Sequence, residues 1–132
     1  MERWGATGAG LALVFAGALA AWGGAAPATI QAEGLSISLV TVPSQPARHE
    51  ATTFEVSIRD AGGMPVARAR VSLDVKMAGM AMEENRPRVQ ERAGGRYVAT
   101  GAFSMGGEWL AAVEVVLTDG RRARAEFPLR VR

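Results

Sequence analysis

The sequence contains no cysteine and only one histidine, His49, among its 132 residues. The missing cysteines exclude a disulfide scaffold, a thiolate metal site, an iron–sulfur cluster and a cysteine nucleophile. A single histidine is too few for a multi-histidine zinc site or for a histidine-centred triad with alternatives. Motifs of serine hydrolases, P-loop enzymes, zinc proteases and dinucleotide-binding enzymes are absent as well. We therefore expect a protein that is not an enzyme.

An excess of charge of one sign is also missing, because 15 Lys and Arg stand against 13 Asp and Glu, a formal net charge of +2. The one dense basic cluster consists of Arg121, Arg122 and Arg124. It has no interleaved aromatic residues of the kind that stack on bases, so we expect no binding of nucleic acid. Aromatic residues make up only 6% of the chain. The core must therefore consist mainly of Val, Leu, Ile, Phe and Met.

A long uncharged stretch, residues 5–31, follows Arg3 near the N-terminus. Arg3 supplies a short positive region, and residues 11–22 supply an apolar segment of about the length that a signal peptide uses. The uncharged stretch is also long enough to cross a bilayer core of about 30 Å as an uncleaved helix. The sequence therefore predicts a hydrophobic signal or anchor helix, with cleavage and retention both open.

Two tripeptides that end in alanine, Ala26-Pro27-Ala28 and Ile30-Gln31-Ala32, are passable sites for cleavage by a signal peptidase. We expect residues 1–32 to be the signal peptide or membrane anchor, and residues 33–132 to be a single folded domain. Both interpretations place the domain outside the cytoplasm, in the periplasm or at the cell surface, secreted or anchored to the membrane.

From residue 35 onward apolar and polar residues alternate with a period of two, as in half-buried β-strands. For example, Phe54, Val56 and Ile58 alternate with polar residues. Asp119-Gly120 is typical of a two-residue hairpin turn. The pattern predicts an all-β immunoglobulin-like β-sandwich of about seven strands, with a small barrel as the alternative. The expected strands span residues 35–39, 54–58, 71–77, 88–91, 97–103, 109–117 and 123–131.

Half of the six methionines fall in one short run, Met77-Ala-Gly-Met80-Ala-Met82, and Met105 follows in a later glycine-rich segment. Thioethers are soft donors that bind Cu(I) well, so copper is the natural partner of such a cluster outside the cytoplasm. In a strand Met80 and Met82 would lie on one face, about 6.6 Å apart. Gly79 permits a bulge that could redirect Met77.

Two further interpretations of these residues stay open. Methionine is a common gap-filling residue in cores, so any one of the four could be packing rather than a ligand. His49 lies in a polar connection before a strand, where an imidazole is either solvated or available to complete a methionine site. The candidate metal ligands are thus Met77, Met80, Met82, Met105 and His49.

Four segments occur in a fixed order: Asp60-Ala-Gly-Gly-Met-Pro65 leading into Val71, the methionine run, Gly95-Arg-Tyr97, and Phe103-Ser-Met-Gly-Gly-Glu-Trp109. In this order they resemble the YtkA-like domain family, which is related to the FixH proteins. The resemblance covers residues 35–131 and implies a small exported or membrane-anchored β-sandwich. Met77, Met80, Met82 and Met105 match the family's methionines.

The family resemblance also implies a context of copper handling and cytochrome oxidase assembly. Many relatives carry a histidine directly after the methionine run, whereas Glu83-Glu84-Asn85 follows here. We therefore expect an extracytoplasmic accessory domain that binds Cu(I), with a copper donor or acceptor protein or a membrane oxidase complex as partner. The alternative is a non-metal interaction module or assembly factor of a membrane complex that uses the methionine segment as a contact patch.

Overall fold

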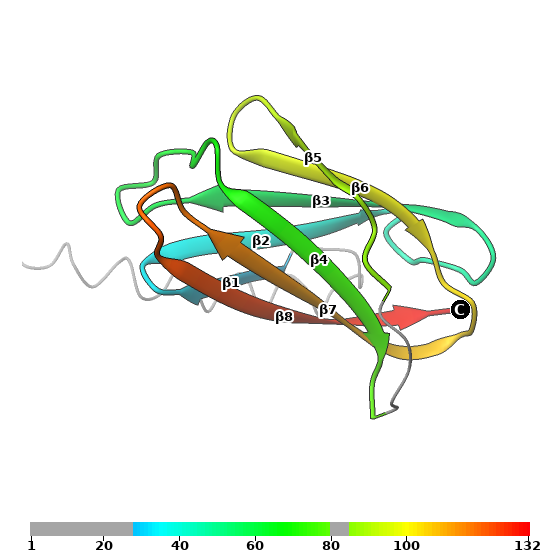
Figure 1. Ribbon diagram of the computed structural model, residues 1–132. Helices are drawn as coiled ribbons and strands as arrows, with labels where there is room; N and C mark the ends of the chain where they lie inside the picture. Colours follow the sequence, from blue (N-terminus) through cyan, green and yellow to red (C-terminus); the bar gives the residue numbers. More distant parts are fainter. Residues whose placement is uncertain (1–27, 80–84) are drawn as a thin grey trace, which may run out of the picture.

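The computed structural model describes residues 28–79 and 85–132, and these form eight β-strands without a helix (Figure 1). The expected N-terminal helix lies outside the described residues. Within residues 28–79 and 85–132, no helix is long and apolar enough to cross a membrane. The strands are β1 (Ala28–Ala32), β2 (Leu35–Val42), β3 (Ala51–Arg59), β4 (Arg70–Met77), β5 (Val89–Arg92), β6 (Arg96–Ala102), β7 (Gly107–Val116) and β8 (Arg122–Val131).

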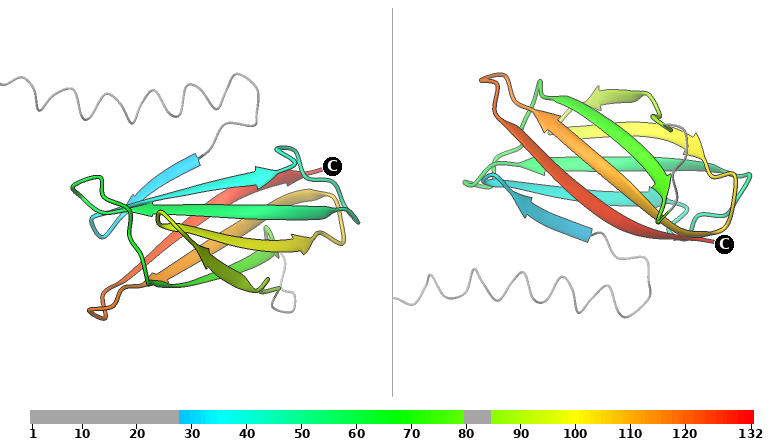
Figure 2. Two further views of the ribbon diagram at one scale, coloured as in Figure 1. Left: turned by 90° about the horizontal axis from the view of Figure 1, so that it is seen from above. Right: turned by 60° about the horizontal axis from the view of Figure 1, so that its bottom comes forward.

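The strands form two antiparallel sheets that pack face to face, as the two views of Figure 2 show. One sheet has the order β1-β2-β3-β6-β5 and the other has the order β4-β7-β8. With β1 set aside, four strands face three in the arrangement of the immunoglobulin constant-type sandwich. The predicted all-β immunoglobulin-like sandwich is therefore confirmed.

The eighth strand, β1, is the one that the sequence pattern did not predict. It pairs with β2 from Ala28 opposite Leu39 to Ala32 opposite Leu35, and Ile30 and Ala32 pack against the core. The sandwich thus begins at Ala28, five residues before the predicted domain boundary at residue 33. The short strand was hidden because four of its five residues lie within the uncharged stretch at residues 5–31, in which no alternation stands out.

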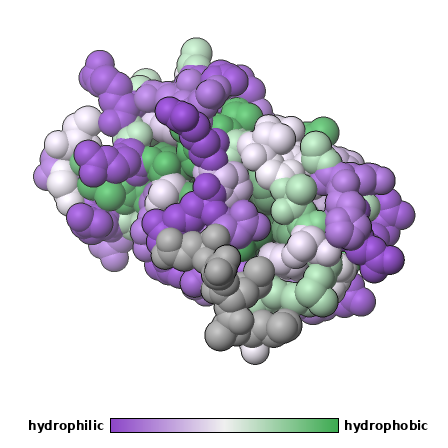
Figure 3. Space-filling view, turned by 45° about the vertical axis from the view of Figure 1, so that its right-hand side comes forward, coloured by the Kyte–Doolittle hydropathy of each residue, from purple (hydrophilic) through white to green (hydrophobic). Residues whose placement is uncertain are grey.

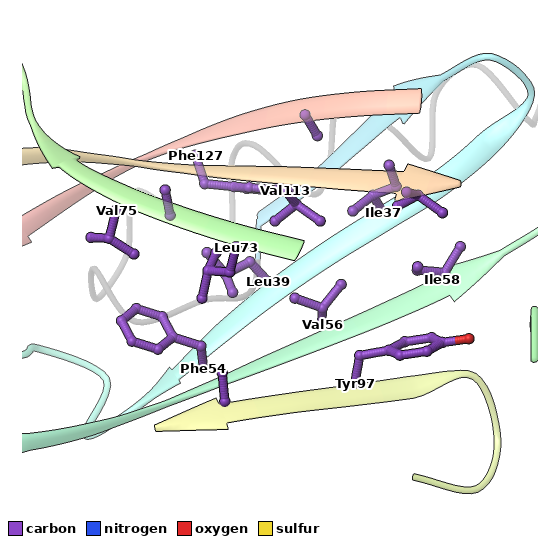
Figure 4. Packing of buried hydrophobic residues seen from close by; sticks show 14 of the residues in the cluster. Ile37, Leu39, Phe54, Val56, Ile58, Leu73, Val75, Tyr97, Val113 and Phe127 are labelled. Carbon is purple, nitrogen blue, oxygen red and sulfur yellow. The ribbon is translucent and has the colours of Figure 1, made fainter. Parts of the chain in front are cut away.

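Alternation along each strand decides which side chains enter the core. In β3, Phe54, Val56 and Ile58 are at most 2% exposed, whereas the residues between them lie on the outer face. Figure 4 shows side chains from both sheets filling the same space, with Leu73 and Val113 facing Leu39 and Val56. The period of two read from the sequence is therefore the period of burial.

The turn between β7 and β8 has three residues rather than the two predicted. Leu117 N–H donates to Arg121 O at 2.8 Å, and Gly120 N–H donates to Leu117 O at 2.9 Å. Gly120 has φ +92°, so the connection is a turn closed by a residue in the left-handed region, which glycine adopts without strain.

The end of the sandwich that carries the connections at residues 60–69, 93–95 and 117–121 is called the Tyr97 end below. Tyr97 is 2% exposed, and its hydroxyl donates to Val66 O at 2.8 Å and accepts from Ala69 N–H at 3.2 Å. Burial raises the pKa of the Tyr97 phenol, against a smaller opposing effect of the Ala69 N–H. One buried side chain thus holds the second half of the β3–β4 connection at two points.

Candidate metal centre

The opposite end of the sandwich, at the right of Figure 1, carries the connections at residues 43–50 and 103–106 together with the last residue of β4, Met77. We call it the methionine end. The antiparallel topology brings these segments together, because β2, β4 and β6 all finish there. Three of the predicted ligands, His49, Met77 and Met105, therefore lie at one end of the fold.

Met77 closes β4 opposite Trp109 of β7 and is half-buried against the core. A Cβ built on Gly107 would lie 3.0 Å from the Met77 Cε atom. The methyl end of Met77 therefore lies over the backbone of Gly107, at the start of β7 and two residues from Met105. This packing depends on the absence of a side chain at residue 107.

Met105 is 51% exposed although its backbone is attached to the core. The Trp109 indole Nε1–H donates to the Met105 carbonyl at 3.0 Å. Trp109 itself is 1% exposed, and its ring meets that of Phe103 edge-to-face with centroids 5.0 Å apart. The loop is thus fixed from below while the thioether remains accessible to solvent.

His49 lies on the neighbouring loop, exposed and with φ +66°. Its backbone N–H donates to Phe103 O at 2.8 Å, which ties the β2–β3 connection to the loop that carries Met105. Arg48 N–H donates to Arg132 O at 2.9 Å, and Arg132 N–H donates to Pro46 O at 2.9 Å. Backbone hydrogen bonds therefore hold the loop of the imidazole beside the loop of a thioether.

Met80 and Met82 lie outside the described residues. On one side of this segment Ala78 is hydrogen-bonded to β7, and on the other side Asn85 is hydrogen-bonded to β4. Ala78 N–H donates to Glu108 O at 2.8 Å, and Val75 N–H donates to Asn85 O at 2.9 Å. The chain therefore leaves β4 and returns to it at the methionine end.

The described carboxylates do not gather around these residues. Among the described residues, no group of three or more His, Cys, Asp or Glu side chains is placed to hold a metal ion. The nearest carboxylate in sequence to Met105, that of Glu108, forms an ion pair with Arg130. In the space-filling view of Figure 3, hydrophobic and hydrophilic surface alternate over this side of the molecule. The soft and borderline donors described at the methionine end are thus two thioethers and one imidazole.

Trp109 is a buried core aromatic, and sequence reasoning missed the bond from its indole to Met105. It also missed the attachment of Pro46 and Arg48 to Arg132. The bond from Trp109 has a signal in the sequence, since a buried tryptophan requires an acceptor for its N–H. The bonds to Arg132 have no such signal, because they join residues far apart in the chain.

The fold and the methionine end define a small immunoglobulin-like sandwich that presents thioethers on its loops. A family model described as YtkA-like matches residues 29–114. Because the match spans more than half of the chain, the chain belongs to the YtkA-like family. No curated protein matches the sequence.

Two solved structures are similar in fold. A DUF4426 family protein from Pseudomonas aeruginosa PAO1 superposes with a TM-score of 0.55 at 12% identity, covering 79% of this chain and 93% of that one. The filamin domain of Lin-41 superposes with a TM-score of 0.53 at 18% identity, covering 80% of this chain and 98% of that one. At these identities the likeness supports the fold alone.

Proposed function

We propose that this chain is a non-enzymatic, extracytoplasmic accessory domain that binds Cu(I) for handling or delivery. The proposed ligands are Met77, Met80, Met82 and Met105, with His49 as an optional ligand. The observation that carries the proposal is the gathering of His49, Met77 and Met105 on adjoining segments of one end, although 28 residues separate the first two in sequence and a further 28 separate Met77 from Met105.

The chemistry of this donor set favours Cu(I) over other metals. Neutral thioethers are poor ligands for hard cations such as Mg²⁺ and Ca²⁺, which require oxygen donors. Copper(I) accepts thioethers and imidazole, and it tolerates the low coordination numbers that a few loop residues supply. Neutral donors also bind without releasing protons, so the affinity would depend little on pH unless His49 takes part.

A domain of this kind requires a partner that supplies or accepts the ion. An export signal or anchor in residues 1–27, ahead of β1, would place the domain outside the cytoplasm, free or held at the membrane. We propose a copper donor or acceptor protein, or a membrane oxidase complex, as that partner. Met105, which is 51% exposed, carries the described thioether best placed for transfer of the ion from one protein to another.

The test is an anaerobic titration of Cu(I) into the full chain against a competing chelator. We expect a defined stoichiometry for the native chain and loss of competition when Met80→Leu and Met82→Leu are combined. Met105→Leu and Met77→Leu should each weaken binding, since leucine keeps the volume but removes the sulfur donor. Circular dichroism establishes that each variant is folded.

Met64→Leu is the matched control. Met64 is 63% exposed and lies in the β3–β4 connection at the Tyr97 end, so its thioether is available to solvent but remote from the proposed ligands. Its replacement should leave the titration unchanged. If the native chain competes no better than buffer, or if Met64→Leu weakens binding as much as Met105→Leu, the copper proposal fails.

The rival function is an interaction module of a membrane complex, with the methionine end as its contact patch. One observation favours it: Val42 at the end of β2 is 60% exposed and Met105 is 51% exposed, so two large hydrophobic side chains are accessible at this end. Under this alternative, leucine should replace methionine with little effect on partner binding. Met105→Asp should instead abolish co-purification with a membrane complex.

A further inference from the structure

The outer edge of β4 carries backbone groups that have no backbone partner among the described residues. Strand β4 borders its sheet and, among the described strands, pairs with β7 alone (Figure 1). Ala78 N–H donates toward β7, whereas Val75 N–H donates to Asn85 on the other side. Because backbone groups alternate along a strand, Val71 and Leu73 point their N–H and C=O groups to the same outer side as Val75. Among the described residues these groups have no backbone partner.

The open part of this edge is short and bounded at both ends. At one end Asn85 O already occupies the position opposite Val75, at 2.9 Å from its nitrogen. At the other end Arg68 has φ +60°, and its N–H donates to the Glu91 carboxylate at 2.8 Å, so the chain turns away from the line of the strand. The open stretch is therefore residues 70–74, with Ser72 at its centre.

Opposite charges lie at the two ends of this stretch, both on the outer face of the sheet. Arg70 is exposed and forms no ion pair in the part of the chain that the structure describes. The Oδ1 atom of Asp74 is buried and has no hydrogen-bond partner there, while Oδ2 lies 3.5 Å from Lys76 Nζ. An exposed cation and an incompletely satisfied carboxylate thus lie two residues before and two residues after Ser72 in β4.

We propose that two copies of this chain associate by pairing their β4 edges in antiparallel fashion, with Ser72 on the two-fold axis. Val71 then lies opposite Leu73 of the second copy, and the two residues exchange both backbone hydrogen bonds. Arg70 lies opposite Asp74 of the second copy in a non-hydrogen-bonded pair, where side chains approach most closely. Two three-stranded sheets become one sheet of six strands.

The charges select this register among those that the edge permits. Sliding the second copy by two residues in one direction places Val71 opposite Val75, whose N–H is already bonded to Asn85. Sliding it by two in the other direction places Arg70 opposite Ser72 and removes both ion pairs. A slide by one residue opposes backbone groups that face β7, so no bonds form. The interface is isologous, because each copy supplies both charges.

Sedimentation velocity of the full chain in a density-matched detergent, from micromolar to millimolar protein, tests this pairing. We expect a monomer–dimer equilibrium whose dissociation constant rises by about tenfold or more with Arg70→Asp or with Asp74→Arg, because each change opposes like charges twice. An equimolar mixture of the two variants should recover the dimer, since one copy then presents carboxylates at both positions and the other presents guanidinium groups. Arg70→Asp combined with Asp74→Arg in one chain should recover it as well.

Arg122→Asp is the matched control. Arg122 and Arg70 are both in register with Val116 on opposite sides of β7, so the same charge change occurs on the same sheet, away from the β4 edge. It should leave the dissociation constant within about twofold of the native value. A chain that stays monomeric at every concentration, or a dimer that Arg70→Asp weakens no more than Arg122→Asp, overturns the proposal.

A cysteine at the two-fold axis tests the register independently. The chain has no native cysteine, and opposed residues of a non-hydrogen-bonded pair have Cα atoms about 4.5 Å apart, within disulfide range. With diamide as oxidant, two thiols at Ser72→Cys should form a disulfide-linked dimer as diamide takes up two electrons and two protons. Ser57→Cys, on the outer face of the other sheet, should remain largely monomeric. Equal cross-linking of the two variants contradicts the register.

Discussion

At the Tyr97 end of the sandwich, side chains close the loops: Tyr97 holds Val66 and Ala69, and the Glu91 carboxylate holds the backbone of Arg68. At the methionine end, the Trp109 indole holds Met105 O, but the loops are joined to one another through their backbones, as in the bond from His49 N–H to Phe103 O. At the Tyr97 end, side chains are thus used to hold the loops in place. At the methionine end, the side chains of His49 and Met105 are exposed on loops whose backbones are held in place. The second arrangement is the one that suits ligand binding, because the loops are ordered before the ligand arrives.

The largest effect is expected at the close backbone contact of the Tyr97 end. Gly95 has φ +73°, and a Cβ there would lie 2.9 Å from both Ile58 O and Val66 N. Gly95→Ala should lower the free energy of unfolding by about 3 kcal/mol or more, because backbone atoms on two sides cannot yield. Urea denaturation followed by circular dichroism measures this loss.

Gly94→Ala is the control for Gly95→Ala. Gly94 has φ +80°, but nothing lies within 4 Å of its added Cβ. Only the left-handed strain remains, at about 1–2 kcal/mol. Equal losses for the two variants would mean that the backbone of Gly95 is not in close contact with Ile58 and Val66. The Tyr97 end would then not be more rigidly packed than the methionine end.

A smaller loss is expected when the Tyr97 hydroxyl is removed. Tyr97→Phe keeps the buried ring but leaves Val66 O without its donor and Ala69 N–H without its acceptor. We expect the free energy of unfolding to fall by about 1–3 kcal/mol. An unchanged value would show that the β3–β4 connection does not depend on the phenol.

The pH dependence of stability gives a second measurement on Tyr97. Its pKa in the folded protein is raised above the ordinary value of 10.0, so the unfolded chain loses the phenol proton first as the pH rises. The contribution of Tyr97 to stability is therefore fully present below pH 10.0 and declines above it. Tyr97→Phe should remove this part of the alkaline decline; an identical alkaline profile for the two proteins would contradict the assignment.

The sequence predicted most of the fold because each strand carries its own alternation. All seven predicted strands exist, and the residues that alternate, such as Phe54, Val56 and Ile58, are the buried ones. Strand β1 was not predicted, because its pairing with β2 depends on the turn at Glu33-Gly34 and not on a pattern of alternation within the strand. The three-residue turn at Asp119-Gly120 depends on which residues pair beyond it, which local sequence does not specify.

The candidate site was predictable in its residues but not in its arrangement. Met77, Met105 and His49 were identified from thioether and imidazole chemistry alone. That two of them lie on hydrogen-bonded loops depends on the bond between His49 and Phe103, residues 54 positions apart. Such a contact follows from the order of strands in the sheets, and no spacing in the chain encodes it.

The smallest effect is expected at the methionine end, from a polar atom buried without a partner. Thr52 is 0% exposed in β3, and its Oγ1 makes no hydrogen bond with the described residues. Thr52→Val replaces the hydroxyl with a methyl group of similar shape, so the cost of desolvating that hydroxyl disappears. We expect the free energy of unfolding to rise by about 1 kcal/mol, measured by urea denaturation.

Thr53→Val is the control for Thr52→Val, because Thr53 is the next residue and lies on the outer face of the same strand. It should change the free energy of unfolding by less than about 0.5 kcal/mol. If Thr52→Val instead lowers the free energy of unfolding, the hydroxyl has a hydrogen-bond partner. The buried polar side chains of the methionine end would then be hydrogen-bonded, as Tyr97 is at the other end. If it raises stability and leaves the Cu(I) titration unchanged, the unsatisfied hydroxyl is a cost of packing under the loops rather than a part of the site. The difference between the two ends then lies in the exposed side chains of His49 and Met105, which can bind a ligand, and not in the packing beneath the loops.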